Sequence, residues 1–413
     1  MATKNPTNLK ESSTSGPTTK STKSTKPAVP KATKKNYIRV GVAIVAITVA
    51  LTQNFFRTAS TDLGLFLGDI QPFNTAGCEV VPGGLEACED IHLHRESGLA
   101  FMTCGHAEAR KDWFPPMAKL NASADDIAFQ DKFVIYNVAT GKYEEMELAG
   151  LPKGTDRVFH GLGIHERSPT ELTIFAVNHR RGGSVIEVLE YTIGDKVVQY
   201  KETIRHELIH TPNDILATGP RSFYVSNDHK YKSGANREFE ELLRRPLSNV
   251  IYYSPESTHI AYDHVASANG ITSNSDQSLI YLSACHGAGL HILRATADHT
   301  LVDQEYIKLD FYNDNPSYDP DTDSVFVTGH VKPLTLSMGL KKKGVQLDGP
   351  SKIVKISKDV VSGGHKVETV LEDDGRLIST GTVSAVDRKR GVMLVGTAFS
   401  NRGVVRCPIP QGA

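Results

Sequence analysis

Short runs of alternating apolar and polar residues recur from about residue 62 to residue 409, separated by clusters of Gly, Asn, Asp and Pro. A period of two is typical of β-strands with one buried face. Examples are SVIEVLEYTI (184–193), NVIYYS (249–254) and GVMLVGTAF (391–399). The main helical pattern in this span is NREFEELLRR at 236–245, which places Phe239, Leu242 and Leu243 on one face. The pattern therefore predicts an almost wholly β domain.

One unit recurs along this domain: a polar opening residue, an apolar strand, a polar turn and a returning strand. Residues 211–229, TPNDILATGPRSFYVSNDH, show it most fully. Repeats of this size form arrays of small sheets. The openings lie 45 to 71 residues apart, at Glu89, His160, Asn213, Asn269, Asp314 and Gly381.

The repeat length favours one architecture over its main alternative. Six units after residue 56 have about 60 residues each, a normal size for a four-stranded propeller blade with loops. A pair of β-sandwiches would need a linker near the middle, and the sequence shows none. We therefore predict an all-β, six-bladed β-propeller whose opening residues face a common axis.

The chain before the propeller has a different composition. Residues 1–36 are rich in Lys, Ser, Thr and Pro, and predict a disordered basic cytosolic tail. Residues 37–56 form an apolar stretch of about the length that crosses a bilayer. Lysines before it favour a signal anchor of a type II membrane protein, with the rest of the chain lumenal or extracellular. A cleaved signal peptide and a buried helix are the alternatives. We assign 57–77 to a linker and 78–413 to the propeller.

Charge excludes one class of partner. The 413 residues carry a formal net charge of −1, with 39% hydrophobic and 23% charged residues. Without the basic tail no cationic excess remains, so we expect no nucleic-acid binding.

The five cysteines are consistent with an oxidising compartment. Cys78 and Cys407 flank the first and last repeats, so a bridge between them would join the two ends of a closed ring. Cys88 and Cys104 flank the first strand pair and could bridge locally. Cys285 is then left over, either as a small buried side chain or as a thiol in the pocket. Asn121 begins a glycosylation sequon, Asn-Ala-Ser.

Oxygen-bearing residues at the openings suggest a metal centre. Their carboxylates and amides are ligands that Ca²⁺ takes, and the set carries only two negative charges. Its members are Glu89, Asn213, Asn269, Asp314 and Asn315. Asp90 and Asp214 would point the other way along their strands, and would build a second site. Asn and Asp also open turns in any β protein, so the alternative that these residues are ordinary turn residues stays open.

Four polar residues near the openings are candidates for catalysis. His160 and His179 begin and end one repeat, and His330 ends another. A histidine near a metal site can act as a general base, and Asp228 is a candidate to support it. Other histidines, including His92, His94, His165, His206 and His210, are expected at the surface or in turns. The sequence has neither a GxSxG elbow nor a zinc-ligand spacing, so a serine-hydrolase mechanism is unsupported.

Several segments resemble the serum paraoxonase and arylesterase family of calcium-dependent esterases and lactonases. They are EDIHLHRESGLAF, HGLGI, FAVNH, TIRHELIHTPNDILATGPRSFYVSNDHKY, ANGIT, STGTVSAV and LVGTAF, in this order between Cys78 and Cys407. The resemblance implies a six-bladed propeller with two calcium ions in a central tunnel. It implies that the catalytic calcium is held by Glu89, Asn213, Asn269, Asp314 and Asn315, and the structural one by Asp90, Asp214 and the carbonyl of Leu162.

The resemblance also assigns roles to other residues. It implies that His160 and His179 form a catalytic dyad, that His330 lies in the pocket, and that Cys78 and Cys407 form the closing disulfide. Calcium would polarise the carbonyl of a small ester or lactone, and water activated by His160 would attack it. Cys88, Cys104 and the segment Cys285-His286-Gly287 depart from the family pattern, which leaves substrate preference open.

Two further functions are compatible with the same architecture. One is a membrane-anchored binding scaffold in which calcium is purely structural. The other is a propeller similar to strictosidine synthase, which would not be expected to keep the full set of Asn and Asp ligands. The pattern gives no signal for the oligomeric state.

Overall fold

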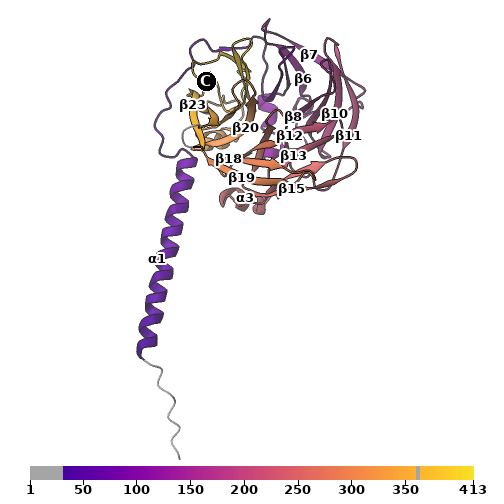
Figure 1. The fold of residues 1–413 in the computed structure, drawn as a ribbon. Helices are drawn as coiled ribbons and strands as arrows, with labels where there is room; N and C mark the ends of the chain where they lie inside the picture. Colours follow the sequence, from indigo (N-terminus) through magenta and orange to yellow (C-terminus); the bar gives the residue numbers. More distant parts are fainter. Residues whose placement is uncertain (1–30, 360–362) are drawn as a thin grey trace, which may run out of the picture. The chain divides into compact units, whose positions relative to one another are not determined.

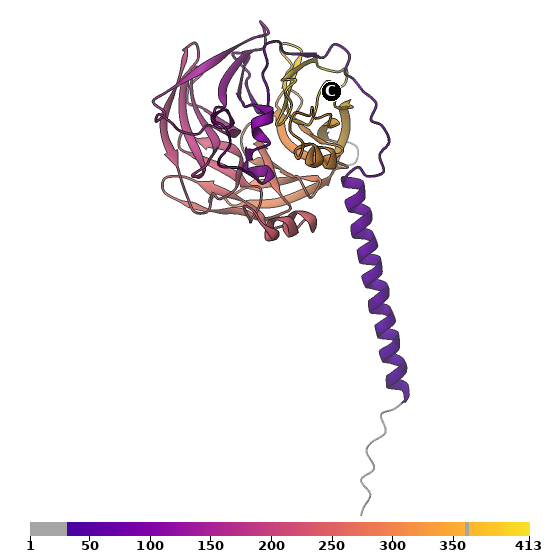
Figure 2. The same ribbon diagram turned by 180° about the vertical axis from the view of Figure 1, so that it is seen from behind.

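The structure is a computed structural model that describes residues 31–359 and 363–413. The predicted basic tail lies, as far as residue 30, outside the described residues. The chain divides into two compact units, residues 1–56 and 57–413. The second unit is mainly β, with small sheets in a propeller-like arrangement (Figures 1 and 2).

The apolar N-terminal segment forms the long helix α1 (Lys31–Asp62), which extends beyond both ends of the predicted 37–56 span. Its stretch Asn36–Asp62 is long and apolar enough to cross a membrane, and no other helix in the described ranges meets that test. Together with the disulfides, this helix indicates the secretory pathway.

The centre of the second unit is a closed cycle of inner strands. Each of them contacts the next, and the last contacts the first, so their facing edges surround a common axis. In cyclic order they are β2 (Cys88–His94), β8 (Phe159–Glu166), β12 (Pro212–Gly219), β16 (Ala268–Ser273), β20 (Tyr312–Asp319) and β24 (Gly381–Asp387).

Three further strands lie outside each inner strand, and the parallel pairing of β7 with β11 joins the first two sets into one eight-stranded sheet. The second strands are β3 (Leu99–Cys104), β9 (Glu171–Arg180), β13 (Ser222–Asn227), β17 (Leu279–Ala284), β21 (Ser324–His330) and β25 (Val392–Thr397). The third strands are β6 (Lys132–Asn137), β10 (Gly183–Thr192), β14 (Ser248–Tyr253), β18 (Gly289–Ala295), β22 (Ser351–Lys358) and β26 (Val405–Pro408). The outer strands are β7 (Lys142–Ala149), β11 (Val197–Ile204), β15 (Thr258–Val265), β19 (Leu301–Lys308), β23 (His365–Asp373) and β1 (Glu79–Val80).

The two ends of this unit are joined in one sheet. β1 pairs antiparallel with β26, and a disulfide links Cys78 to Cys407 directly beside this pairing. A second disulfide, Cys88–Cys104, crosses from β2 to β3. Because β1 comes from the beginning of the unit and β26 from its end, opening the ring would require breaking both the pairing and the Cys78–Cys407 bond.

Apolar side chains fill the spaces between neighbouring sheets. One buried cluster joins Val134 of the first sheet to Val383 of the last. Another joins Tyr224 of β13 to Ile271 of β16 and Leu282 of β17. Full burial of such a side chain stabilises the fold by about 1.5–3 kcal/mol. The core therefore lies between sheets, and the axis is left to polar residues.

Short elements occur in the connections between the strands. They are α2 (Ala107–Arg110), β4 (Trp113–Phe114), η1 (Pro115–Met117), β5 (Lys119–Leu120), η2 (Asp126–Phe129), α3 (Ala235–Leu242) and α4 (Pro333–Gly339). Phe114, Phe129, Leu336 and Phe399 pack together there in a buried apolar cluster.

The helix expected at 236–245 is α3, but its apolar face is not the buried one. Phe239 and Leu242 are exposed, whereas Arg237 and Glu240 are buried. The reason is a set of hydrogen bonds: Arg237 donates to Glu241 and to the carbonyl of Pro116, and Glu240 accepts from the main-chain N–H groups of 230 and 231.

The segment expected to be a linker, 57–77, is held against the ring. Asp62 is almost fully buried and pairs with Arg244 at 2.6 Å and with Lys308 at 2.8 Å. Further along, Phe73 forms an isolated bridge with Glu372 of β23. These contacts are within the second unit.

Candidate functional site

The opening residue of every repeat lies where its inner strand leaves the register of its neighbour. The register shifts occur between 88 and 91, 159 and 162, 212 and 215, 268 and 271, 313 and 316, and 381 and 383. Such a bulge re-aims side chains that regular pairing would hold in the sheet. The six bulges bring the polar opening residues to the axis.

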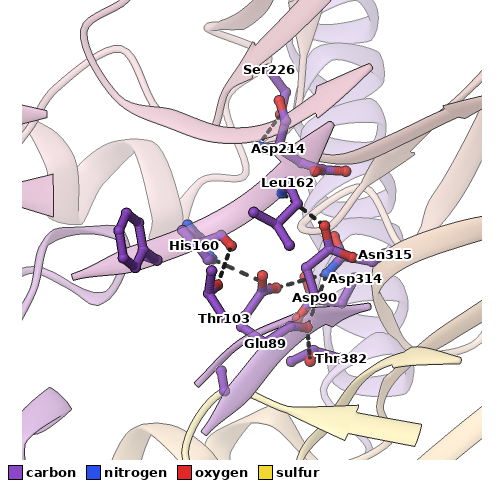
Figure 3. A network of polar contacts seen from close by, with 12 residues as sticks. Glu89, Asp90, Thr103, His160, Leu162, Asp214, Ser226, Asp314, Asn315 and Thr382 are labelled. Atoms are coloured by element: carbon purple, nitrogen blue, oxygen red, sulfur yellow. Dashed lines mark hydrogen bonds and ion pairs between the residues drawn. The ribbon is translucent and has the colours of Figure 1, made fainter. Parts of the chain in front are cut away.

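We name the first group of these residues the Glu89 cluster. It consists of Glu89, Asn213, Asn269, Asp314 and Asn315, all of which are buried. The amide of Asn315 donates to Glu89 Oε1 at 2.7 Å, as Figure 3 shows. Four of these residues, all except Asn315, line one cavity of about 80 Å³.

Unpartnered oxygens distinguish this cluster. Glu89 Oε2 and the side-chain oxygens of Asn213, Asn269 and Asn315 are buried and, among the described residues, have no hydrogen-bond partner. Leaving one buried acceptor unsatisfied costs about 1–3 kcal/mol. A hard divalent cation takes such carboxylate and amide oxygens as ligands. The oxygen atoms of the Glu89 cluster therefore fit the ligand set of a calcium ion.

The charge distribution supports the same fit. Burial raises the pKa of Glu89 well above its usual range, and the carboxylates of Asp314 and Asp90 raise it further. A positive charge among these groups would reverse this effect, because it favours the ionised carboxylate.

Two glycines allow the inner strands to approach closely at the site. A Cβ atom on Gly161 would lie 2.5 Å from the main-chain oxygen of Asn213. A Cβ atom on Gly270 would lie 2.4 Å from Asn315 Oδ1. Both positions therefore require glycine for the oxygens to converge.

His160 and His179 form a hydrogen-bonded pair beside the Glu89 cluster. His160 Nε2 lies 3.6 Å from Glu89 Oε1, and its Nδ1 lies 3.2 Å from His179 Nε2. On the other side, His179 Nδ1 lies 2.8 Å from Ser184 Oγ. Burial lowers the pKa of His160 well below its usual range and that of His179 to about 3. Both imidazoles are therefore neutral at physiological pH.

A buried network holds this pair in place. Asp131 pairs with Arg110 at 3.1 Å and accepts the N–H of Phe159 at 2.9 Å. Trp113 Nε1 donates to the carbonyl of His179 at 2.6 Å. The residues on both sides of the pair are thus fixed by polar contacts in the core, and the rings also pack edge-on against Phe114.

The other two candidate catalytic residues contact different partners. His330 Nε2 lies 3.2 Å from Asp314 Oδ2, which places it at the Glu89 cluster. Asp228 lines the same cavity, but its Oδ1 lies 3.1 Å from His229 Nδ1. Although burial alone would raise the pKa of Asp228, His229, Arg237 and His160 lower it to about 2. The group hydrogen-bonded behind His179 is thus Ser184 rather than Asp228.

A second polar group, the Asp90 cluster, consists of Asp90, His92 and Asp214. Their ligand atoms all lie within 4.8 Å of one another, and His92 Nε2 lies 3.1 Å from Asp90 Oδ2. The N–H of Leu162 donates to the same Oδ2 at 2.9 Å (Figure 3). Burial and Asp90 raise the pKa of Asp214 well above its usual range. Unlike the Glu89 cluster, this one contains a nitrogen ligand.

Both polar and apolar groups line the 80 Å³ cavity. Phe114, Met117, Leu336 and Phe399 supply apolar surface. Cys285 is a free cysteine that lines the cavity beside His286, and burial raises the pKa of its thiol well above the usual range. A neighbouring cavity of about 260 Å³ lies against His179 and Ser184.

Two residues at the site were missed by sequence reasoning. His92, expected at the surface, is partly exposed and contacts Asp90, whereas His94, expected there too, is buried at 3% exposure. Because residues two apart share a face of a strand, the position of His92 after Asp90 was a usable signal. Ser184 follows two glycines that indicate only a turn, so no sequence pattern signals its contact with His179.

Comparisons with known proteins identify relatives of this chain. The family model Arylesterase matches residues 69–406. Serum paraoxonase/arylesterase 1 of Rattus norvegicus is 27% identical over 365 residues, which cover 87% of this chain and 97% of that protein. Serum paraoxonase/lactonase 3 of Homo sapiens is 26% identical over 334 residues, covering 80% and 89%.

A solved structure of a luciferin-regenerating enzyme has a similar fold. It aligns with a TM-score of 0.51 at 13% identity, covering 83% of this chain and 96% of that one. The family match extends over most of the second unit and includes every residue of both clusters. The chain therefore belongs to the paraoxonase and arylesterase family of hydrolases.

Proposed function

We propose that this protein is a calcium-dependent hydrolase of small esters and lactones, built as a six-bladed β-propeller around a central tunnel. The observation that carries the proposal is the set of four buried, unpartnered oxygens in the Glu89 cluster, next to a neutral histidine pair. Calcium held by Glu89, Asn213, Asn269, Asp314 and Asn315 would stabilise negative charge developing on the carbonyl oxygen of the substrate.

His160 is the proposed general base. Its neutral ring can accept a proton at Nε2, the nitrogen that faces Glu89. With Nε2 free, the ring carries its proton on Nδ1 and donates it to His179 Nε2, and His179 in turn donates from Nδ1 to Ser184 Oγ. His179 and Ser184 thereby hold His160 in the tautomer that can accept a proton.

The reaction then balances as a hydrolysis. The oxygen of a water molecule forms a bond to the carbonyl carbon while its proton passes to His160 Nε2. The bond between that carbon and the alkoxy oxygen breaks, and the leaving oxygen takes up a proton. An ester gives an acid and an alcohol, and a lactone gives a hydroxy acid. His330 lies beside Asp314 and would contact the carbonyl group of the substrate.

The cavity favours small, largely apolar substrates. Its volume is about 80 Å³, and Phe114, Met117, Leu336 and Phe399 provide apolar contacts for an alkyl or aryl group. Cys285 and His286 contribute a polar portion to the wall, so we expect preference among lactones to depend on this side.

A second cation would have a structural role. Its proposed ligands are Asp90, Asp214 and the carbonyl of Leu162. Asp90 and Asp214 directly follow Glu89 and Asn213 in the chain, so their side chains point to the opposite face of the strand. Without a cation two buried carboxylates would lie close together, and a bound cation would offset their repulsion.

We propose that α1 anchors the protein in a membrane, with a cytosolic tail and the propeller on the lumenal or extracellular side. The disulfides Cys78–Cys407 and Cys88–Cys104 require an oxidising compartment for the second unit. Asn121 is exposed, as a glycan acceptor must be.

The test is turnover of aliphatic lactones and phenyl esters by the full chain in detergent, with wild type and His160→Gln compared. We expect wild-type hydrolysis and a loss of about 10²–10⁴-fold in kcat for His160→Gln. Calcium content should be unchanged in the variant, because His160 is not a proposed ligand. Undiminished turnover by His160→Gln would reject the general-base role. If wild type binds calcium and hydrolyses none of these substrates, the protein is a binding scaffold with structural calcium.

A further inference from the structure

The 260 Å³ cavity adjoins the 80 Å³ cavity that holds the Glu89 cluster. Pro116 and Asp228 belong to the walls of both, so the two spaces are direct neighbours. The proposed function places the reacting carbonyl group in the smaller cavity. The larger one is then the space available to a side group that the substrate carries beyond its carbonyl.

Cationic side chains predominate among the charged groups of the larger cavity. They line it together with a single carboxylate, that of Asp228 at the boundary with the smaller cavity. Arg237 is only 2% exposed, whereas Arg181 and Lys232 are exposed to solvent. The cavity therefore has a cationic group in its buried part and others near its rim. The four cationic residues are Arg180, Arg181, Lys232 and Arg237.

Hydrogen-bond donors on these cations are left over. Each of the three arginines uses Nε and Nη2 to bind one carboxylate, which fixes its guanidinium group. The pairs are Arg180–Glu187, Arg181–Asp156 and Arg237–Glu241. Within the described ranges, the Nη1 groups of these arginines have no hydrogen-bond partner, and Lys232 has neither a hydrogen-bond nor an ion-pair partner. Guanidinium and ammonium donors of this kind bind anionic oxygens.

The rest of the lining indicates what carries the anion. Much of it is apolar, from Trp113, Pro115, Pro116, Leu120 and Pro212. An alkyl chain would pack against these side chains. Asp228 is ionised at physiological pH and repels further negative charge, so a carboxylate with one charge fits better than a doubly charged phosphate.

We propose that the 260 Å³ cavity is a carboxylate-binding subsite, and that the preferred substrates are lactones whose alkyl side chain ends in a carboxylate. Lys232 and the Nη1 groups of the arginines would bind this carboxylate while the lactone carbonyl lies at the Glu89 cluster. The inference rests on the proposed function for the reaction of the lactone ring, and it adds the chemical class of the side group.

The experiment compares two γ-lactones that differ only at the end of the side chain, one with a carboxylate and one with a carboxamide. Both are hydrolysed by the full chain in nonionic detergent with calcium. Because the reacting ring is the same, the ratio of the two kcat/KM values reports the side group alone. Wild type should favour the carboxylate by about 10-fold at low ionic strength, and less as salt is added.

Substitutions of Lys232 test the subsite at an exposed position. Lys232→Met should lower the ratio by about 3–5-fold, and Lys232→Glu should make the carboxamide the better substrate. The matched control is Lys389→Met, at an exposed lysine that lines neither cavity and has no ion-pair partner among the described residues. It should leave the ratio unchanged. Far-UV circular dichroism shows whether each variant folds.

Binding of adipate, a dicarboxylate that cannot be hydrolysed, makes the test independent of turnover. Calorimetry should show about 5–10-fold weaker binding to Lys232→Glu than to wild type. If this difference is found but wild type hydrolyses neither lactone, the subsite stands and the proposed function fails. If wild type hydrolyses both lactones equally well, or if Lys232→Glu keeps the wild-type ratio and adipate affinity, the subsite is refuted and the proposed function stands.

Discussion

The Glu89 cluster and the Asp90 cluster are built from adjacent residues of the same strands, yet they meet their neighbours differently. Glu89 and Asn213 carry oxygens without donors, whereas Asp90 and Asp214 accept main-chain N–H groups. In the proposed function, the first arrangement leaves acceptors free for a cation that would also contact substrate. The second fixes its carboxylates in advance, as a structural site requires. We therefore expect substitutions in the Glu89 cluster to affect activity and substitutions in the Asp90 cluster to affect stability.

Among substitutions within the two clusters, the largest expected effect is on activity at the Glu89 cluster. Glu89→Gln removes one of its two carboxylates, so calcium affinity should fall and kcat/KM for a lactone should drop by about 10²–10³-fold. Lactone hydrolysis and calcium content of the purified variant measure both effects. Glu207→Gln, an exposed site, is the matched control and should leave both unchanged. Wild-type calcium content in Glu89→Gln would contradict the assignment.

The Asp90 cluster should respond in stability instead. Asp214→Asn removes a proposed metal ligand and weakens the hydrogen bonds that Asp214 accepts from the N–H groups of Ile215 and Ile271. The free energy of unfolding of the metal-loaded protein should therefore fall by about 2–3 kcal/mol. Denaturant unfolding measures this loss, with the exposed Asp321→Asn as control. At denaturant concentrations below the unfolding transition, the activity of Asp214→Asn should fall far less than that of Glu89→Gln. A loss of kcat equal to that of Glu89→Gln would mean that the two clusters do not divide these roles.

Only some of the features that make the two clusters differ can be predicted from the sequence. Strand alternation separates Glu89 from Asp90, and repetition predicts that the openings meet at an axis. The bulges that aim those residues depend on how β2, β8 and their counterparts approach one another, which the pattern does not encode. Whether an oxygen keeps or lacks a donor depends on main-chain groups from other strands, such as Leu162 and Ile271.

The histidines show the same limit. His160 and His179 were identifiable because they flank a repeat, and the family resemblance also indicated them. His92 was assigned to the surface because histidines are common in this chain, and its contact with Asp90 depends on the face of β2 that it shares. Cys285 was open between two interpretations, and the structure places it in the cavity wall.

Once EDTA has removed all metal, the stability contributions of His179, beside the Glu89 cluster, and His92, in the Asp90 cluster, should depend on pH with opposite signs. The folded pKa of His179 is about 3, below the unfolded value, so its contribution to stability is present above about pH 6.5 and is lost as pH falls. The slope should reach about 1.4 kcal/mol per pH unit. His92 has a folded pKa of about 8, so its contribution is present below about pH 6.5 and is lost as pH rises through 8.

Denaturant unfolding between pH 5 and pH 9 measures these two arms. Because the His92 side chain is 31% exposed, solvent screening should limit its contribution to about 1 kcal/mol. His179→Gln should reduce the slope of the acid arm, to which the lowered pKa values of His160 and His286 also contribute. His92→Gln should reduce the slope of the alkaline arm. If each substitution flattened the opposite arm, the pKa directions would be wrong.

The smallest expected effect is at Ser184. Ser184→Ala removes the acceptor behind His179, so His160 is held less firmly in its proton-accepting tautomer, and kcat should fall by about 3–10-fold. The pH dependence of kcat should shift, because the His160–His179 pair loses the hydrogen bond from His179 Nδ1 to Ser184 Oγ. Ser184→Thr keeps the hydroxyl and should restore most of the activity. A threonine variant no better than alanine would show that the hydroxyl is not used.

The most direct test of the calcium site is lactone turnover as a function of free calcium in metal-stripped full-length protein. We expect no turnover in excess EGTA. On titration, activity should return along the same curve as a single calcium-binding event seen by calorimetry, and Glu89→Gln should lack that event. Full turnover in excess EGTA, or a binding event that Glu89→Gln retains unchanged, would contradict the account.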